Sequence, residues 1–239
     1  MKKIAFFVEG PTEADFVKAY LKEVTSQRGL ITVKEFTGGK YSTRVYTQTY
    51  SDNAGSDYMV DIYVSGADNR VNSDILDNLP SLVASGFAAA VGLRDLRGQK
   101  TDGSMFTLAD LAGVERASHR IFAGKNPPVH SVIAVMEIET WFMAETNHYP
   151  VIDPSLTQAL ITSNAGSLGV NPYIDDLTQV AQPAETLNDI YHLAGKAYSK
   201  DAAHRQRTIN ALDYANLYVN VPARLVKFDE FKRIVDSLL

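Results

Sequence analysis

The sequence predicts an α/β fold in which a largely parallel β-sheet is flanked by helices. Up to about residue 150, short apolar segments rich in β-branched residues alternate with segments whose apolar residues recur at helical spacing. The first of these segments, 3–8, is continuous and does not alternate with polar residues, which is typical of a strand covered on both faces. Strands that alternate with helices in this way favour parallel pairing.

Strands are expected at 3–8, 30–36, 58–65, 87–93 and 129–136. The segment 87–93 is the most apolar of the chain, so it is the candidate for a central strand. Helices are expected from Ala14 onward, with Pro11 in the first turn, and at 71–85, 108–122 and 137–145. Pro80 is a point at which the helix 71–85 can divide. The polar stretch 37–57 predicts a loop or a hairpin.

After about residue 150 the strand signal fades and the remaining pattern is helical. Helices are expected at 153–162, 184–193, 200–216 and 228–238, separated by proline and glycine. We therefore predict an α/β domain over residues 1–150 and a helical C-terminal extension over 151–239 that packs on it.

Composition limits the chemistry that is open to this chain. It has 239 residues and no cysteine, which excludes disulfides, thiolate metal sites and a cysteine nucleophile. The net charge of -5 argues against a protein that coats nucleic acid through a broad basic surface. No apolar run approaches the roughly 18 residues of a membrane span, and the run 4–8 is too short for a signal peptide. We expect a cytoplasmic protein without a membrane-spanning segment.

Acidic residues follow several of the predicted strands. Glu9 comes after the first strand, Asp95 after the strand 87–93, and Glu137 and Glu139 after the last one. Parallel sheets bind ligands beyond the carboxyl ends of their strands, and carboxylates gathered there suit a hard cation such as Mg²⁺. Each acid also has an ordinary explanation: Glu9 as a strand end, Asp95 as a turn cap, and Glu13 as a first-turn acid that favours the helix dipole.

Other chemistries have weaker support. The histidines show no pairing at metal-ligand spacing, and neither a G-x-S-x-G elbow nor a phosphate-binding P-loop is present. Basic residues near the C-terminal end form either a local phosphate-binding patch or a solvated helix face. They are Lys196, Lys200, His204, Arg205 and Arg207.

Four motifs resemble those of a known family. The run Val8-Glu9-Gly10-Pro11-Thr12-Glu13 resembles the V-E-G-x-[ST]-E opening of Toprim domains, and the segment 91–98 occupies the place of their D-x-D strand end. The segment 137–145 resembles E-x-W-[LF]-x-x-[DE], and 195–200 resembles G-K-x-Y-x-K. The likeness is greatest to stand-alone Toprim-like proteins (the DUF4276 type) related to overcoming-lysogenization-defect nucleases, and it extends to about residue 200.

The resemblance implies a Toprim sheet and phosphodiester chemistry that depends on Mg²⁺ or Mn²⁺. By position, Glu9 and Asp95 would be catalytic residues and metal ligands, with Glu13 and Glu139 as further metal ligands. Lys200 would stabilise charge on the phosphate in the transition state. The family also implies a role in anti-phage defence beside an ATPase partner of the AAA or ABC type. Homo-oligomerisation stays open.

One position departs from the family pattern. Arg97 replaces the second aspartate of D-x-D, and an arginine cannot bind a cation. Glu137 or Glu139 can compensate, or Arg97 can contact the phosphate, with Lys196 as a second phosphate-binding residue. Two hypotheses follow: a metal-dependent nuclease acting on DNA or RNA, and a catalytically degenerate interaction or sensor subunit that works with a partner ATPase.

Overall fold

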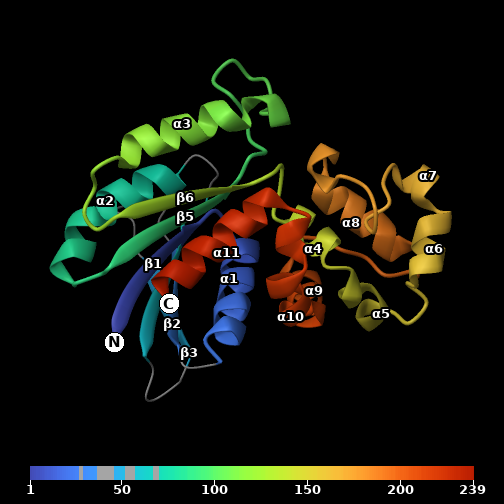
Figure 1. The fold of residues 1–239 in the computed structure, drawn as a ribbon, viewed down its shortest axis with the longest axis horizontal. Coiled ribbons are helices and arrows are strands. Elements are labelled where there is room, and N and C mark those ends of the chain that lie inside the picture. The colour runs from blue at the N-terminus through green and yellow to red at the C-terminus, as the bar shows by residue number, and fades with distance from the viewer. Residues whose placement is uncertain (27–28, 37–45, 52–56, 67–69) are drawn as a thin grey trace.

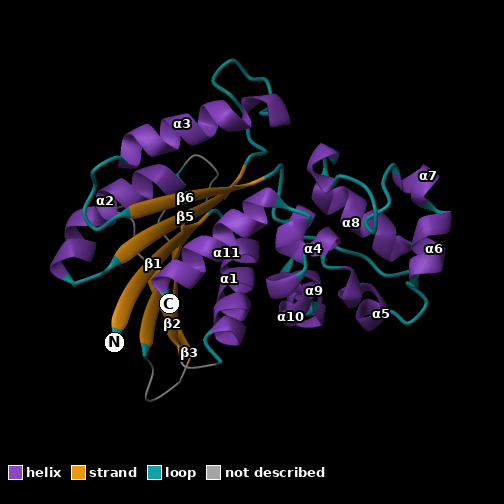
Figure 2. Cartoon of the chain, in the orientation of Figure 1, coloured by secondary structure: helices purple, strands orange, loops and turns teal. Residues whose placement is uncertain are grey.

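The computed structural model describes residues 1–26, 29–36, 46–51, 57–66 and 70–239, and these form an α/β fold around one mixed sheet (Figure 2). Within the described residues the sheet has six strands in the order β3-β2-β4-β1-β5-β6. They are β1 (Lys2–Val8), β2 (Gly29–Phe36), β3 (Tyr46–Ser51), β4 (Tyr58–Val64), β5 (Ala89–Asp95) and β6 (Val129–Ala134). All neighbouring strands are parallel except β2 and β3, which are antiparallel.

The predicted α/β class, with a largely parallel sheet flanked by helices, is confirmed, and two predictions for parts of the sheet can be compared with the structure. Part of the stretch 37–57 forms the antiparallel edge strand β3, whereas 37–45 and 52–56 lie outside the described residues. The strand predicted at 87–93 is β5, which begins later and ends at Asp95. It lies between β1 and β6, so it is an interior strand, while β4 and β1 form the middle of the sheet.

Helices cover both faces of the sheet (Figure 1). On one face, α1 (Pro11–Val24) and α11 (Val226–Leu238) pack with Ile4, Phe6 and Val8 of β1 into the main core. On the other face, α2 (Val71–Ala84) packs against Ala5 and Phe7, and α3 (Leu111–Phe122) lies along β6. Alternate residues of β1 therefore enter two cores, which explains its continuous apolar run.

The helix α2 continues through Pro80 without dividing. The proline lies on the exposed side of the helix in its C-terminal half. The missing backbone N–H therefore weakens the helix without leaving a buried carbonyl group unpaired.

Between β6 and α11 the chain forms short helices, which begin before the predicted boundary at residue 150 and continue through the extension. They are α4 (Glu139–Ala144), α5 (Tyr149–Ile152), α6 (Gln158–Ser163), α7 (Ala165–Leu168), α8 (Pro183–His192), α9 (Ala202–Ala211) and α10 (Tyr214–Val219). The helix predicted at 153–162 begins only at Gln158, because Asp153 Oδ1 accepts a hydrogen bond from the Ser155 N–H in a turn. The helix predicted at 200–216 is two helices, since Asp213 caps α10 through the Asn216 N–H.

The extension and the sheet share one core. Trp141 of α4 contacts Phe16 of α1 and Phe228 of α11, with ring centroids 5.7 and 5.1 Å apart. The chain thus leaves the sheet after β6, forms the extension, and returns with α11 to cover the sheet (Figure 1). In the part of the chain that the structure describes, no helix has both the length and the hydropathy to cross a membrane.

Candidate metal centre

The carboxyl ends of β1 and β5 bring the first two predicted acids together. These strands are parallel neighbours, with Val8 opposite Leu93. Glu9 follows Val8, and the backbone N–H of Asp95 donates a hydrogen bond of 3.2 Å to Glu9 Oε2. The expected convergence of these two residues at one edge of the sheet is therefore present.

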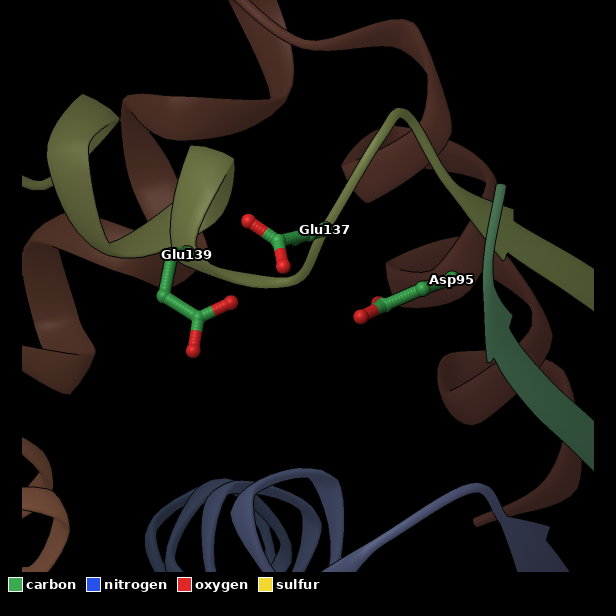
Figure 3. A group of neighbouring side chains, drawn as sticks. All are labelled: Asp95, Glu137 and Glu139. Carbon is green, nitrogen blue, oxygen red and sulfur yellow. The ribbon is translucent and has the colours of Figure 1, made fainter. Parts of the chain in front are cut away.

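A turn after β6 brings two further glutamates to the same edge. Met136 has a φ of 59°, a left-handed conformation that costs a residue with a Cβ roughly 1 kcal/mol. The chain turns there, and the Ile138 N–H donates a hydrogen bond of 2.9 Å to Asp95 Oδ1. This bond fixes Glu137 and Glu139 beside Asp95, so that the three carboxylates face a common space (Figure 3).

Asp95, Glu137 and Glu139 form the acidic triad of this site. One carboxylate oxygen from each lies within 4.8 Å of the other two, which is close enough for one cation to contact all three. Their exposed fractions are 3%, 6% and 0%. Burying carboxylates is costly unless they are paired or bind a cation, so the partners of each oxygen decide what the triad can do.

Both oxygens of Glu137 have strong donors. Its Oε1 lies 3.1 Å from Arg97 Nη1 and 3.3 Å from Lys200 Nζ. Its Oε2 accepts a hydrogen bond of 3.0 Å from the Ala184 N–H in the first turn of α8, where the helix dipole also favours a negative charge. Glu137 is therefore a well-compensated carboxylate.

Glu139 and Asp95 are less completely paired. Glu139 Oε1 accepts a hydrogen bond of 2.7 Å from the Tyr198 hydroxyl, while Oε2 is buried and has no hydrogen-bond partner among the described residues. Asp95 Oδ1 accepts the Ile138 N–H, and Oδ2 lies 3.8 Å from Lys200 Nζ. The triad thus leaves Asp95 Oδ2 and Glu139 Oε2 as the oxygens with lone pairs to offer.

Lys200 lies within salt-bridge distance of all three acids. Its Nζ is 3.3 Å from Glu137, 3.7 Å from Glu139 and 3.8 Å from Asp95. The two longer distances exceed an ordinary hydrogen bond. The lysine side chain is 45% exposed, whereas the acids are buried, so the ammonium group reaches the triad from the solvent side.

The pKa values of these groups reflect crowding of negative charge in a buried site. Burial raises the pKa of Asp95 well above its ordinary value, and the neighbouring carboxylates raise it further. Burial also raises the pKa of Glu139 to about 7, against the lowering effect of Lys200. The pKa of Lys200 itself is raised, because the attraction of the acids outweighs the cost of its partial burial.

Glu13 faces the site but serves as a helix cap. Its Oε2 accepts a hydrogen bond of 2.8 Å from the Gly10 N–H at the start of α1. A Cβ at position 10 would lie 3.2 Å from this same oxygen, so glycine gives the carboxylate its room. Burial raises the pKa of Glu13. The structure therefore places Glu13 next to the triad without adding it to the group of carboxylate oxygens within 4.8 Å.

Among the residues that the structure describes, Arg97 and Lys200 are the only predicted basic residues that form ion pairs with the acidic triad. Lys196 lies 3.3 Å from Asp153, and Arg205 lies 2.6 Å from Asp15. Arg207 donates to the backbone carbonyl of Ala197. Lys196 and Arg207 therefore make contacts within the extension, and Arg205 joins it to α1.

Sequence reasoning missed Tyr198 as a part of this site. The residue lies in the segment 195–200, which resembles G-K-x-Y-x-K, but no sequence pattern indicates that its hydroxyl contacts Glu139. It also named only Glu139 of the two glutamates as a metal ligand and offered either one as compensation for Arg97, whereas both lie in the triad. Comparisons with protein-family models, with curated proteins and with solved structures give no match for this chain.

Proposed function

We propose that this protein is a metal-dependent phosphodiesterase of the Toprim type that hydrolyses DNA or RNA. The observation that carries the proposal is the buried Oε2 of Glu139 within a triad of carboxylates, which accepts no hydrogen bond among the described residues and has only Lys200 Nζ, 3.7 Å away, as an ion-pair neighbour. A buried carboxylate oxygen without a donor is costly, and a cation shared with Asp95 would compensate it. The resemblance of the strand-end motifs to Toprim domains supports the same function.

The residues present fit Mg²⁺ or Mn²⁺. The donor set consists of carboxylate oxygens alone, which suits a hard cation, and no thiolate is available. Asp95 and Glu139 would hold the ion, with Glu137 beside them and Glu9 behind Asp95. When bound, such an ion polarises a phosphate oxygen and lowers the pKa of a bound water molecule.

The chain supplies its own groups for the phosphate. Arg97 and Lys200 both contact Glu137 Oε1, and their side chains are 32% and 45% exposed, so each can reach a ligand that enters from solvent. A guanidinium group can bind two phosphate oxygens at once. Positive charge held there would stabilise the negative charge that develops on the phosphate in the transition state.

The location, biological role and partner of the protein are proposed from the resemblance to Toprim-like proteins alone. On that basis we propose a cytoplasmic protein in an anti-phage defence system, beside an ATPase partner of the AAA or ABC type. A second candidate function is a catalytically degenerate sensor or interaction subunit. It is favoured by the position of Lys200, whose ammonium group already neutralises part of the triad and can replace a metal ion.

A cleavage assay separates the two candidates. Plasmid, single-stranded DNA and tRNA are incubated with the protein and Mg²⁺ or Mn²⁺, alone and with an ATPase encoded beside it. We expect cleavage by the wild type and a loss of at least about 100-fold in Glu9→Ala and Asp95→Ala, as for removal of groups that act directly in catalysis. Cleavage that survives both substitutions would refute the site, and no cleavage of any substrate would favour the sensor subunit.

A further inference from the structure

We infer that Tyr198 is a positioning residue that orients Glu139 for the cation, an inference that rests on the proposed metal site. The Tyr198 hydroxyl donates a hydrogen bond of 2.7 Å to Glu139 Oε1. The other oxygen, Oε2, lies 3.7 Å from Lys200 Nζ, which is also within 3.8 Å of Asp95 and Glu137, so Oε2 is the oxygen that faces the space shared by the triad. The hydroxyl thus selects which oxygen faces the ion.

The tyrosine is held firmly enough to set this orientation. Its side chain is 5% exposed, and its ring packs edge-on against Tyr191, with centroids 6.2 Å apart. Its backbone N–H donates a hydrogen bond of 2.9 Å to Asn188 Oδ1 of α8. Arg207 of α9 holds the carbonyl of the preceding residue. The hydroxyl direction is therefore fixed by the packing of the extension.

A neutral donor suits this task better than a cation. The Tyr198 hydroxyl is an uncharged donor, and it contacts Glu139 Oε1 directly. It orients the carboxylate without cancelling the negative charge that attracts a metal ion. Lys200, two residues along the chain, carries a positive charge and opposes an incoming cation. The segment 195–200 therefore brings two groups of opposite effect to the triad.

The helical extension consequently takes part in the metal site. Asp95 is the last residue of β5 and Glu139 is the first residue of α4, whereas the hydroxyl that orients Glu139 comes from the segment between α8 and α9. Partners that orient the ligands of a metal typically change its affinity by roughly 10- to 100-fold when they are removed. Removal of the Tyr198 hydroxyl is therefore expected to weaken metal binding by a factor that a titration can measure.

The test compares two phenylalanine variants in the full chain. Tyr198→Phe removes the hydroxyl that contacts Glu139 and keeps the ring, whereas Tyr191→Phe removes a buried hydroxyl that contacts Thr208 in the same aromatic cluster. Binding of Mn²⁺ is measured by electron paramagnetic resonance of the free ion. We expect Tyr198→Phe to raise the Kd roughly 10-fold or more, and Tyr191→Phe to leave it within about 2-fold of wild type.

Asp95→Asn serves as the reference that separates this inference from the proposed function. If the wild type binds Mn²⁺ more tightly than Asp95→Asn but Tyr198→Phe equals the wild type, Tyr198 has no positioning role and the inference is overturned. If the wild type and Asp95→Asn bind alike or not at all, the metal site itself is refuted and the inference with it. Equal weakening in Tyr198→Phe and Tyr191→Phe would indicate general loosening of the cluster and would also overturn the inference.

A measurement on the wild type covers the case in which Tyr198→Phe does not fold. A cation on Glu139 withdraws electron density from the carboxylate and weakens the hydrogen bond from the tyrosine. Addition of Mg²⁺ is therefore expected to change the near-ultraviolet absorption of tyrosine in the wild type and in Tyr191→Phe. Tight Mg²⁺ binding without such a change would contradict a contact between Tyr198 and a metal ligand.

Discussion

The backbone N–H of Asp95 donates a hydrogen bond to Glu9 Oε2 over 3.2 Å. This contact joins the ends of two neighbouring parallel strands. It places the carboxylate of Glu9 next to Asp95. It follows from the register of β1 and β5, which sets Val8 opposite Leu93. The relationship makes Glu9 both a support for the end of β5 and a source of negative charge next to the triad.

Substitution of Lys200 tests whether its ammonium group competes with a metal ion. In Lys200→Met, three buried carboxylates lose a positive neighbour, so the metal-free protein is expected to be less stable. Without the ammonium group the negative charge of the triad attracts Mn²⁺ more strongly, so the Kd for Mn²⁺ is expected to fall roughly 3- to 10-fold. Calorimetric titration and thermal unfolding with and without Mn²⁺ measure both effects.

Lys196→Met is the matched control for this variant. It removes the same charge four residues earlier, from a side chain that pairs with Asp153 away from the triad. Mn²⁺ affinity and stability are expected to change little. A Lys200→Met protein that binds Mn²⁺ more weakly than the wild type would show that the lysine supports the ion and does not compete with it.

The raised pKa of Glu139 predicts how stability depends on pH. Between its ordinary value of 4.5 and about 7, this carboxyl is protonated in the folded state and ionised in the unfolded one. The folded state therefore binds more protons, and the free energy of unfolding of the metal-free protein falls as the pH rises through this window. The contribution of Glu139 is on the order of 3 kcal/mol.

Urea unfolding at about pH 5 and about pH 8 measures this contribution as the difference between the wild type and Glu139→Gln. The wild type should lose stability relative to the variant on going to the higher pH. The affinity of the wild type for Mn²⁺ should rise with pH, because Glu139 must be ionised to bind the ion. Parallel pH profiles for the two proteins would contradict the raised pKa.

Arg97 is expected to act on the phosphate and not on the metal ion. Its guanidinium group lies 3.1 Å from Glu137 and is partly exposed. In Arg97→Gln, loss of a charge-assisted hydrogen bond should raise the KM for nucleic acid by roughly 10-fold or more. The Kd for Mn²⁺ should stay equal or become slightly tighter. Arg120→Gln, on the exposed side of α3, is the control with unchanged kinetics. A large loss of Mn²⁺ binding in Arg97→Gln would refute this role.

Glu145 is expected to join the end of α4 to the start of α10. It is fully buried at the end of α4 and accepts hydrogen bonds from the backbone N–H groups of Asn147, His148 and Asp213. Glu145→Ala leaves these donors without a partner and should lower the free energy of unfolding by about 3 kcal/mol. Denaturant unfolding, followed by Trp141 fluorescence and by circular dichroism, measures the loss.

The same experiment tests the predicted division at residue 150. Because Trp141, Phe16 and Phe228 share one core, the two signals should change in a single transition in the wild type. Two separate transitions would show that the extension unfolds as an independent domain.

The strands and their α/β arrangement could be predicted from sequence because they depend on local patterns. Continuous apolar runs such as 3–8 reflect burial on both faces, and the acids that follow them fall at one edge by the geometry of parallel strands. Glu9 and Asp95 could therefore be placed together without a structure. Helix ends in the extension were less predictable, because side chains such as Asp213 cap a turn inside an otherwise helical pattern.

Contacts between distant segments could not be predicted in this way. Tyr198 and Lys200 reach the triad only because α8 and α9 fold back toward the carboxyl edge of the sheet. The left-handed conformation of Met136, which turns Glu137 inward, also leaves no signal, since methionine rarely adopts it. These features depend on the packing of the whole chain and not on the local pattern of letters.

Crystals grown with Mn²⁺ test the central claim most directly, because anomalous diffraction locates the ion. We predict a peak within coordination distance of Asp95 Oδ2 and Glu139 Oε2, with the Lys200 ammonium group moved toward solvent. Density that shows Lys200 still in contact with all three carboxylates, and no manganese peak at the triad, would contradict the account.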